Sequence, residues 1–134
     1  MSWRIVNPES LVPPRGWNHG LLWDGRGRIL FVAGQTASDA SGRTELNFAG
    51  QFRLALERVV TVVREAGGEP AHIGRLVIYV TNMDTYNESR KFLGEAYREV
   101  MGRHYPAMAL VEVVRLVDSD TKVEIEAMAV LPDA

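Results

Sequence analysis

Two glutamates near the end of the chain, Glu124 and Glu126, have the spacing best suited to acid–base chemistry in this sequence. They lie two residues apart in a segment rich in apolar and β-branched residues, so in a strand both carboxylates point to the same face of the sheet. A carboxyl group held in an apolar cleft can act as a general acid. Structural hydrogen bonds or ion pairs are the alternative role for either residue. The pattern alone leaves both roles open.

The remaining reactive residue types indicate little chemistry. His19, His72 and His104 are far apart and share no ligand spacing, so the sequence predicts no metal site. The chain has no cysteine, which excludes disulfides, thiol nucleophiles and thiolate metal sites. The Gly25-x-Gly27 pair precedes an apolar segment of strand type, and we interpret it as a turn and not as a nucleotide-binding loop. We expect no cofactor.

Length and composition predict one globular domain spanning residues 1–134. Hydrophobic residues make up 46% of the chain and charged residues 24%, the balance of an ordinary globular protein. The net charge is −2 and the lysines and arginines are scattered, so we expect no nucleic-acid partner. No apolar stretch approaches the length of a membrane span, and the N-terminal residues do not resemble a signal peptide. We therefore expect a cytoplasmic protein without a membrane partner.

Two helices are predicted. Asn47 is a suitable N-cap for the first helix, and Gly67-Gly68 marks its end. Thr85 and Glu88 have the spacing of a capping box at the start of the second helix, which Gly102 closes. Apolar residues recur at helical spacing and give the first helix one buried stripe: Phe52, Leu56, Val59, Val60 and Val63.

The strand pattern completes an α+β fold. The segments 17–22 and 29–33 flank a glycine-rich turn and are predicted to form a β-hairpin. Segments 76–80, 107–114 and 123–130 have strand composition, and the last alternates strictly between two faces. One mixed sheet with both helices on one face satisfies this order. The other face carries Glu124, Glu126 and Met128, so we expect subunit association to cover it.

Several segments in order along the chain resemble the RidA (YjgF) family. The resemblance rests on Val32-Ala33-Gly34-Gln35, Glu65–Gly68 followed by Ile73–Val80, Tyr105-Pro106-Ala107, Val111–Val113 and Val123–Ala127. It covers nearly the whole chain. It implies a homotrimer whose sheets form a central barrel, with a small-molecule pocket at each subunit boundary. Well-understood members hydrolyse reactive enamines and imines to ketoacids and ammonia.

The resemblance also implies roles for individual residues. Glu124 matches the family glutamate that positions or protonates the substrate. Gly34 and Gln35 match the Gly-Gln whose backbone lines the pocket, and Ala33 stands where the family has serine. Trp17 takes the place of an aromatic residue that is usually tyrosine.

His19 occupies a position where the family commonly has glutamine. If the segment is a strand, Trp17 and His19 share one side of it, and the imidazole adds a titratable group to the pocket. A hydrogen-bonded surface histidine is the alternative. Trp17 and Met108 could make the pocket more apolar than in other members, or could pack in a trimer interface.

Met108 is the main departure from the family pattern, because an arginine that grips the substrate carboxylate stands there in other members. A guanidinium binds a carboxylate through two charge-assisted hydrogen bonds, and a thioether makes none. We therefore expect 2-aminoacrylate to bind poorly to this divergent member. Arg90 on the second predicted helix could supply the missing cation, or it could lie on the solvated face of that helix.

Three functions follow, in order of preference. The first is hydrolysis of an enamine, imine or related carbonyl compound other than 2-aminoacrylate, with Glu124 as the acid or water-positioning group. The second is a trimer that binds a small ligand without turnover. The third is an endoribonuclease, which the acidic net charge disfavours.

Overall fold

The structure is a computed structural model that describes residues 2–133. No helix within this range is long and apolar enough to cross a membrane. A 3₁₀ turn at Pro70–His72 precedes the fourth strand. The strands and α-helices, in chain order, are β1 (Trp3–Val6), β2 (Gly20–Trp23), β3 (Gly27–Gln35), α1 (Phe48–Glu65), β4 (Ile73–Val80), α2 (Met83–Glu88), α3 (Arg90–Met101), β5 (Ala107–Glu112) and β6 (Val123–Pro132).

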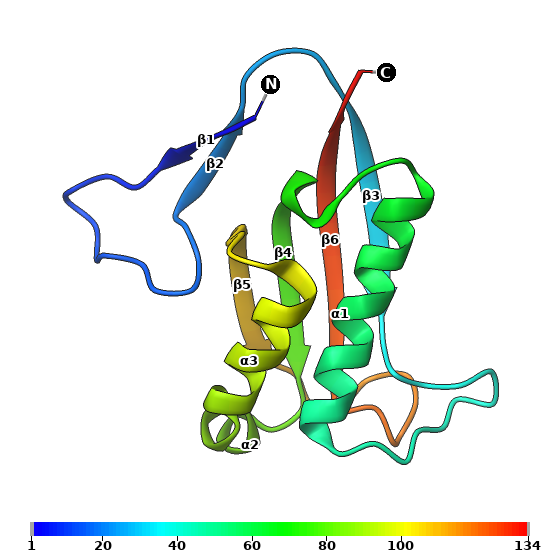
Figure 1. Cartoon of the computed structure of the whole chain (residues 1–134). Helices are drawn as coiled ribbons and strands as arrows, with labels where there is room; N and C mark the ends of the chain where they lie inside the picture. The colour runs from blue at the N-terminus through cyan, green and yellow to red at the C-terminus, as the bar shows by residue number, and fades with distance from the viewer. Residues whose placement is uncertain (1, 134) are drawn as a thin grey trace.

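The main body is a four-stranded sheet with α1 and α3 side by side on one face (Figure 1). The strand order is β3-β6-β4-β5, in which β6 pairs antiparallel with both neighbours and β4 pairs parallel with β5. This confirms the predicted α+β class, the mixed sheet and the placement of the helices. The structure adds a separate two-stranded ribbon of β1 and β2, and the short helix α2.

Helix α1 has the cap, stripe and end that the sequence predicted. The side chain of Asn47 accepts a hydrogen bond from the Gly50 amide at 2.9 Å. All five residues of the predicted stripe are buried against the sheet. Gly67 follows the helix with a φ of +92°, a left-handed conformation that glycine adopts without a Cβ clash. Because several stripe residues are β-branched, burial stabilises this helix more than intrinsic propensity does.

The predicted start of the second helix is wrong. Asn82, not Thr85, is the N-cap, and its side chain accepts from the Thr85 amide at 3.0 Å. Thr85 therefore lies inside the short helix α2. This helix stops at Ser89, whose hydroxyl donates to the carbonyl oxygen of Thr85 at 2.7 Å, and α3 begins at the next residue. The predicted end is confirmed, since Gly102 follows α3 with a φ of +67°.

The predicted hairpin of segments 17–22 and 29–33 is also wrong, because β2 pairs with β1 and β3 pairs with β6. Aromatic packing draws the first two strands together. The rings of Trp3 and Trp23 meet edge to face with centroids 5.0 Å apart. The Trp3 indole also donates to the Ala71 carbonyl oxygen at 2.9 Å and lies over Gly74. The Gly-rich turn therefore carries the chain from one sheet into the other.

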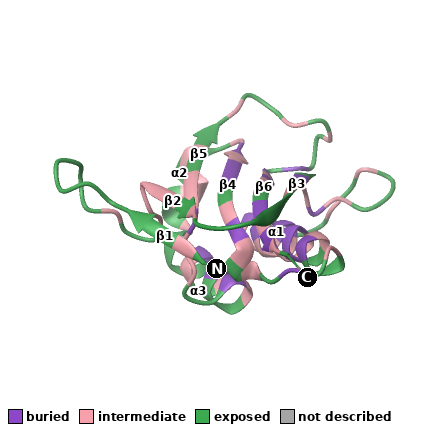
Figure 2. Ribbon diagram, turned by 90° about the horizontal axis from the view of Figure 1, so that it is seen from above, coloured by how far each residue is buried: buried purple, intermediate pink, exposed green. Residues whose placement is uncertain are grey.

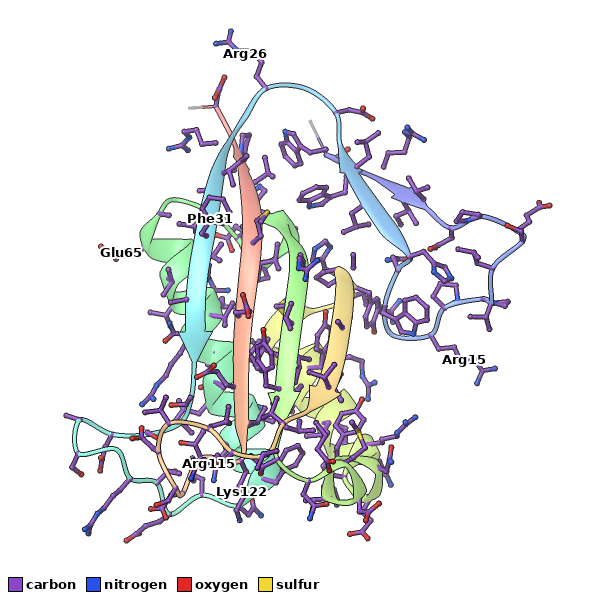
Figure 3. The ribbon with its side chains drawn as sticks, turned by 180° about the vertical axis from the view of Figure 1, so that it is seen from behind. Arg15, Arg26, Phe31, Glu65, Arg115 and Lys122 are labelled. Atoms are coloured by element: carbon purple, nitrogen blue, oxygen red, sulfur yellow. The ribbon has the colours of Figure 1, made fainter. Side chains whose placement is uncertain are left out.

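Strand β6 separates the two faces of the sheet as its alternation predicted. Val123, Ile125, Ala127 and Ala129 are buried towards the helices. Figure 2 shows this buried zone where α1 lies against β4 and β6. The opposite face, seen in Figure 3, carries no helix. It exposes Phe31, Ile29 and Met128 beside the two glutamates of β6, with Phe31 72% exposed.

Candidate functional site

The segment between β1 and β2 runs along the free edge of β5. Asn18 holds it there, because its amide donates to the Pro106 carbonyl oxygen at 3.2 Å and its side chain donates to the Tyr105 carbonyl oxygen at 2.6 Å. Asn7 fixes the segment from the other end, donating to the Asn18 side chain at 2.9 Å and accepting from the His19 amide at 2.8 Å. Sequence reasoning missed both asparagines, which carry no local motif that could have indicated them.

Trp17 and His19 are brought together by this segment. Their rings meet edge to face with centroids 4.6 Å apart. The two residues lie in an irregular segment and not in a strand, so the predicted period-two arrangement is not the reason for their contact. The Nε2 atom of His19 lies 2.7 Å from the Val12 carbonyl oxygen, so this nitrogen is the donor in that hydrogen bond.

Met108 lies beside Trp17 between two cavities. The smaller has a volume of about 320 Å³ and is lined by Trp17, His19, Met108 and an arginine that the sequence did not single out, Arg75. Arg75 lies on β4 directly opposite Ala107 of β5. A guanidinium therefore lies next to the candidate pocket, although position 108 itself carries none.

The larger cavity has a volume of about 750 Å³ and shares Trp17 and Met108 with the smaller one. Arg90 lines it, so the structure brings three of the candidate residues together here. Arg90 is solvent-exposed, its Nε donates to the Asn87 side chain at 3.1 Å, and its guanidinium carbon lies 5.4 Å from the centroid of the Tyr86 ring. Arg90 therefore lies at the cavity wall and is at the same time exposed to solvent.

The other candidate residues form a second group on β3 and β6. Gly34 lies against the carboxyl group of Glu124, since a Cβ at Gly34 would come within 2.7 Å of the Glu124 Cδ. A larger residue at position 34 would displace the end of the Glu124 side chain, so glycine leaves this carboxyl group its present position. Ala33 and Gln35 flank this contact at a bulge in β3, and the Gln35 side chain donates to the Ala33 carbonyl oxygen at 3.1 Å.

The two glutamates of β6 differ in their partners. The Tyr79 hydroxyl donates a hydrogen bond to the Glu126 carboxylate, and this bond raises the pKa of Tyr79 above its ordinary value. Among residues 2–133, no side chain forms a hydrogen bond or ion pair with the Glu124 carboxylate. Within residues 2–133 the Glu126 carboxylate thus has a side-chain partner, whereas the Glu124 carboxylate has none.

Within a single chain, the candidate residues around Met108 at β5 do not lie close to those around Glu124 on β3 and β6. Met108 pairs in register with Leu76, which is fully buried under the helices, so Met108 points to the helix face of the sheet. Glu124 pairs with Tyr79 on the opposite face, one strand away from β3 at the other edge. Within the described range 2–133, no three His, Asp or Glu side chains lie close enough together to hold a metal ion.

Comparison with known proteins identifies the family. The family model described as Endoribonuclease L-PSP matches residues 9–131. The chain belongs to the RidA (YjgF) family. TdcF of Escherichia coli K12, whose name describes it as a candidate reactive intermediate deaminase, is 31% identical over 108 residues, which cover 78% of this chain and 80% of TdcF.

Solved structures of RidA-family proteins have the same fold. YyfB of Yersinia pestis, a Rid-family protein of unknown function, superposes with a TM-score of 0.83 at 31% identity and covers 98% of this chain and 100% of its own. The structure of Escherichia coli TdcF with bound serine superposes with a TM-score of 0.67 at 25% identity, covering 96% of this chain and 99% of TdcF. The fold predicted from the RidA resemblance is confirmed by these likenesses.

Proposed function

We propose that this protein is a cytoplasmic Rid-type hydrolase that acts on a reactive enamine, imine or related carbonyl compound in a pocket between the subunits of a homotrimer. One observation carries the proposal: the unpaired carboxyl group of Glu124 lies under Gly34 at one edge of the sheet, and Trp17, Met108 and Arg90 surround a cavity at the other edge. Association of chains edge to edge brings one group from each of two subunits to a shared site.

The chemistry needs few groups. Water adds to the C=N carbon of an imine, and the resulting carbinolamine loses ammonia to leave a carbonyl compound. Glu124 protonates the leaving nitrogen or holds the attacking water. The backbone at Gly34 and Gln35 polarises the substrate, and Trp17, His19 and Met108 give the pocket its shape. The name of TdcF and its bound serine, an amino acid, support a substrate derived from amino acids.

Met108 sets the substrate apart from 2-aminoacrylate. A thioether cannot bind a carboxylate, and leaving a buried carboxylate unpaired costs several kcal/mol. Any acidic group of the substrate is therefore bound away from position 108. Arg75 lines the smaller cavity, and Arg15, Arg90 and Arg98 line the larger one, so these arginines are the candidates. RNA cleavage has no comparable support, because the net charge is −2.

The test compares ammonia release by the wild-type protein and by Met108→Arg, using 2-aminoacrylate and imines freshly generated from several larger amino acids. We expect the wild-type protein to hydrolyse larger imines but to act weakly on 2-aminoacrylate. Met108→Arg should improve 2-aminoacrylate hydrolysis by about tenfold or more, the value of one charge-assisted hydrogen bond.

Two outcomes would contradict the proposal. Equal rates of wild-type and Met108→Arg on 2-aminoacrylate would mean that position 108 does not select the substrate. Binding of imine analogues without ammonia release by either protein would replace the hydrolase with the second function, a trimer that binds a small ligand without turnover.

A further inference from the structure

The larger cavity has room for a ligand larger than a small imine. It has a volume of about 750 Å³, within the range of pockets that hold drug-sized ligands. Its floor is apolar and aromatic, and its outer wall is helix α3, which lies in front of β4 and β5 (Figure 1). The apolar and aromatic residues that line it are Trp17, Phe52, Ile78, Met83, Tyr86, Leu93, Tyr97, Tyr105, Met108 and Leu110.

Gly94, in the middle of α3, lines this cavity and has no side chain to fill it. Glycine in a helix interior is destabilising relative to alanine, so Gly94 needs a structural or functional explanation. The backbone does not provide one, because Gly94 lacks a positive φ. Neither does packing, since the nearest atom to a Cβ at Gly94 would be Arg98 Nη1, at 3.4 Å. The fold could therefore accommodate alanine at position 94, and the sequence has glycine there instead.

Two arginines flank Gly94 on the same side of α3. Arg90 and Arg98 lie four residues before and after it, the spacing that places side chains along one helix face. The guanidinium of Arg98 reaches back over Gly94, as the 3.4 Å distance indicates. Both arginines line the cavity, and among residues 2–133 neither forms an ion pair. Arg53, on the adjacent helix α1, is by contrast paired with Glu57 and Glu99.

We infer that this cavity receives the apolar body of an amphipathic substrate, an aromatic or branched-chain imino acid, and that Arg90 and Arg98 bind its carboxylate. That such a compound is hydrolysed rests on the proposed function, whereas its binding in this cavity does not. Unpaired guanidiniums beside an apolar wall fit an organic acid with a large side chain. The 2-oxo acid products of such substrates share both features and are stable, so they report on binding alone.

The experiment is calorimetric titration of the full chain with phenylpyruvate, pyruvate and the carboxylate-free analogue phenylacetone. Phenylpyruvate should bind at least about tenfold more tightly than either of the other two, because pyruvate lacks the apolar body and phenylacetone lacks the charge. Arg98→Gln and Arg90→Gln should each weaken phenylpyruvate binding about tenfold, the value of a hydrogen bond to a charged group, and leave phenylacetone unchanged. Lys91→Gln, an equal charge change at an exposed residue of α3 that does not line the cavity, is the matched control.

Gly94→Ala provides a readout that a structural role would not give. It should raise the Tm, because alanine favours the helix, and at the same time weaken phenylpyruvate binding. Equal affinity for phenylpyruvate and pyruvate, or equal effects of Arg98→Gln and Lys91→Gln, would overturn the inference. Phenylpyruvate binding without turnover of any imine would instead contradict the proposed hydrolase and leave this inference standing.

Discussion

At the scale of single residues, the neighbours of Glu124 leave its carboxylate without a side-chain partner within residues 2–133. Gly34 leaves room for its carboxyl group on the adjacent strand, and no side chain within residues 2–133 neutralises it or binds it. Glu126, two residues further on the same face, accepts a hydrogen bond from Tyr79. The two carboxylates thus share a strand and a face but differ in what remains available to a substrate.

Glu124→Gln and Glu126→Gln form a matched pair that tests this difference. Glu124→Gln should lower kcat for imine hydrolysis by about 10²-fold or more, because the amide cannot donate an acidic proton. Glu126→Gln preserves a hydrogen-bond acceptor for Tyr79 and should change kcat only a few-fold. Steady-state ammonia release measures both. Similar losses in the two variants would contradict the assignment of Glu124 as the acid.

Residue types could be predicted from the sequence more readily than their contacts. The resemblance singled out Gly34 and Glu124 as separate matches, but their contact depends on a bulge in β3 that no local pattern indicates. Arg75, Gly94 and Arg98 carried no motif at all. They become candidates only when the fold places them beside a cavity.

At the scale of elements, Gln51 connects helix α1 to the start of β6. This side chain is 1% exposed and donates to the carbonyl oxygens of Leu46 and Asp120 at 2.9 and 3.1 Å. Its own oxygen accepts from the Lys122 amide at 2.8 Å. Because Lys122 lies two residues before Glu124, the helix fixes the strand that carries the candidate acid.

Gln51→Met should destabilise the protein by about 2–3 kcal/mol although it conserves side-chain volume, because three backbone groups lose their hydrogen bonds to a buried side chain. Chemical denaturation measures the free energy of unfolding. Thr61→Ala, which removes one exposed hydroxyl from the same helix, is the control and should cost about 0.5 kcal/mol or less. A cost for Gln51→Met no larger than that of the control would contradict the bridging role.

Helices were predicted well where their signals did not compete. The stripe of α1 is periodic over five residues and its caps are unambiguous. In the second predicted helix two capping signals overlap. The side chain of Asn82 accepts a hydrogen bond from the Thr85 amide, so the helix begins before Thr85. The hairpin error has a different cause. Turn residues indicate that the chain reverses, but the pairing of β2 with β1 depends on the packing of Trp3 against Trp23.

At the scale of the whole molecule, one sheet face is covered by helices and the other exposes apolar side chains. Phe31 on β3, labelled in Figure 3, pairs in register with Met128 on β6, and Ile29 lies two residues before Phe31 on the same strand. All three side chains are exposed. Such a surface is typical of subunit contacts. The trimer that the family resemblance implies would cover it.

Phe31→Lys should therefore convert the proposed trimer to a monomer, since a charge in the interface lacks a partner. Light scattering after size-exclusion chromatography measures the mass. Val117→Lys is the control, because Val117 is 97% exposed and lies off the sheet. Equal masses for Phe31→Lys and the wild-type protein, both trimeric, would exclude this face from the interface.

Subunit complementation tests the proposal that each site is assembled from two chains. Glu124→Gln disables the group on β3 and β6, and Met108→Trp fills the cavities at β5. Each variant alone should be inactive in ammonia release from the best imine substrate. A co-refolded equal mixture should regain activity in about one site in four, because random association pairs two intact groups that often. A mixture no more active than its separate components would contradict the account.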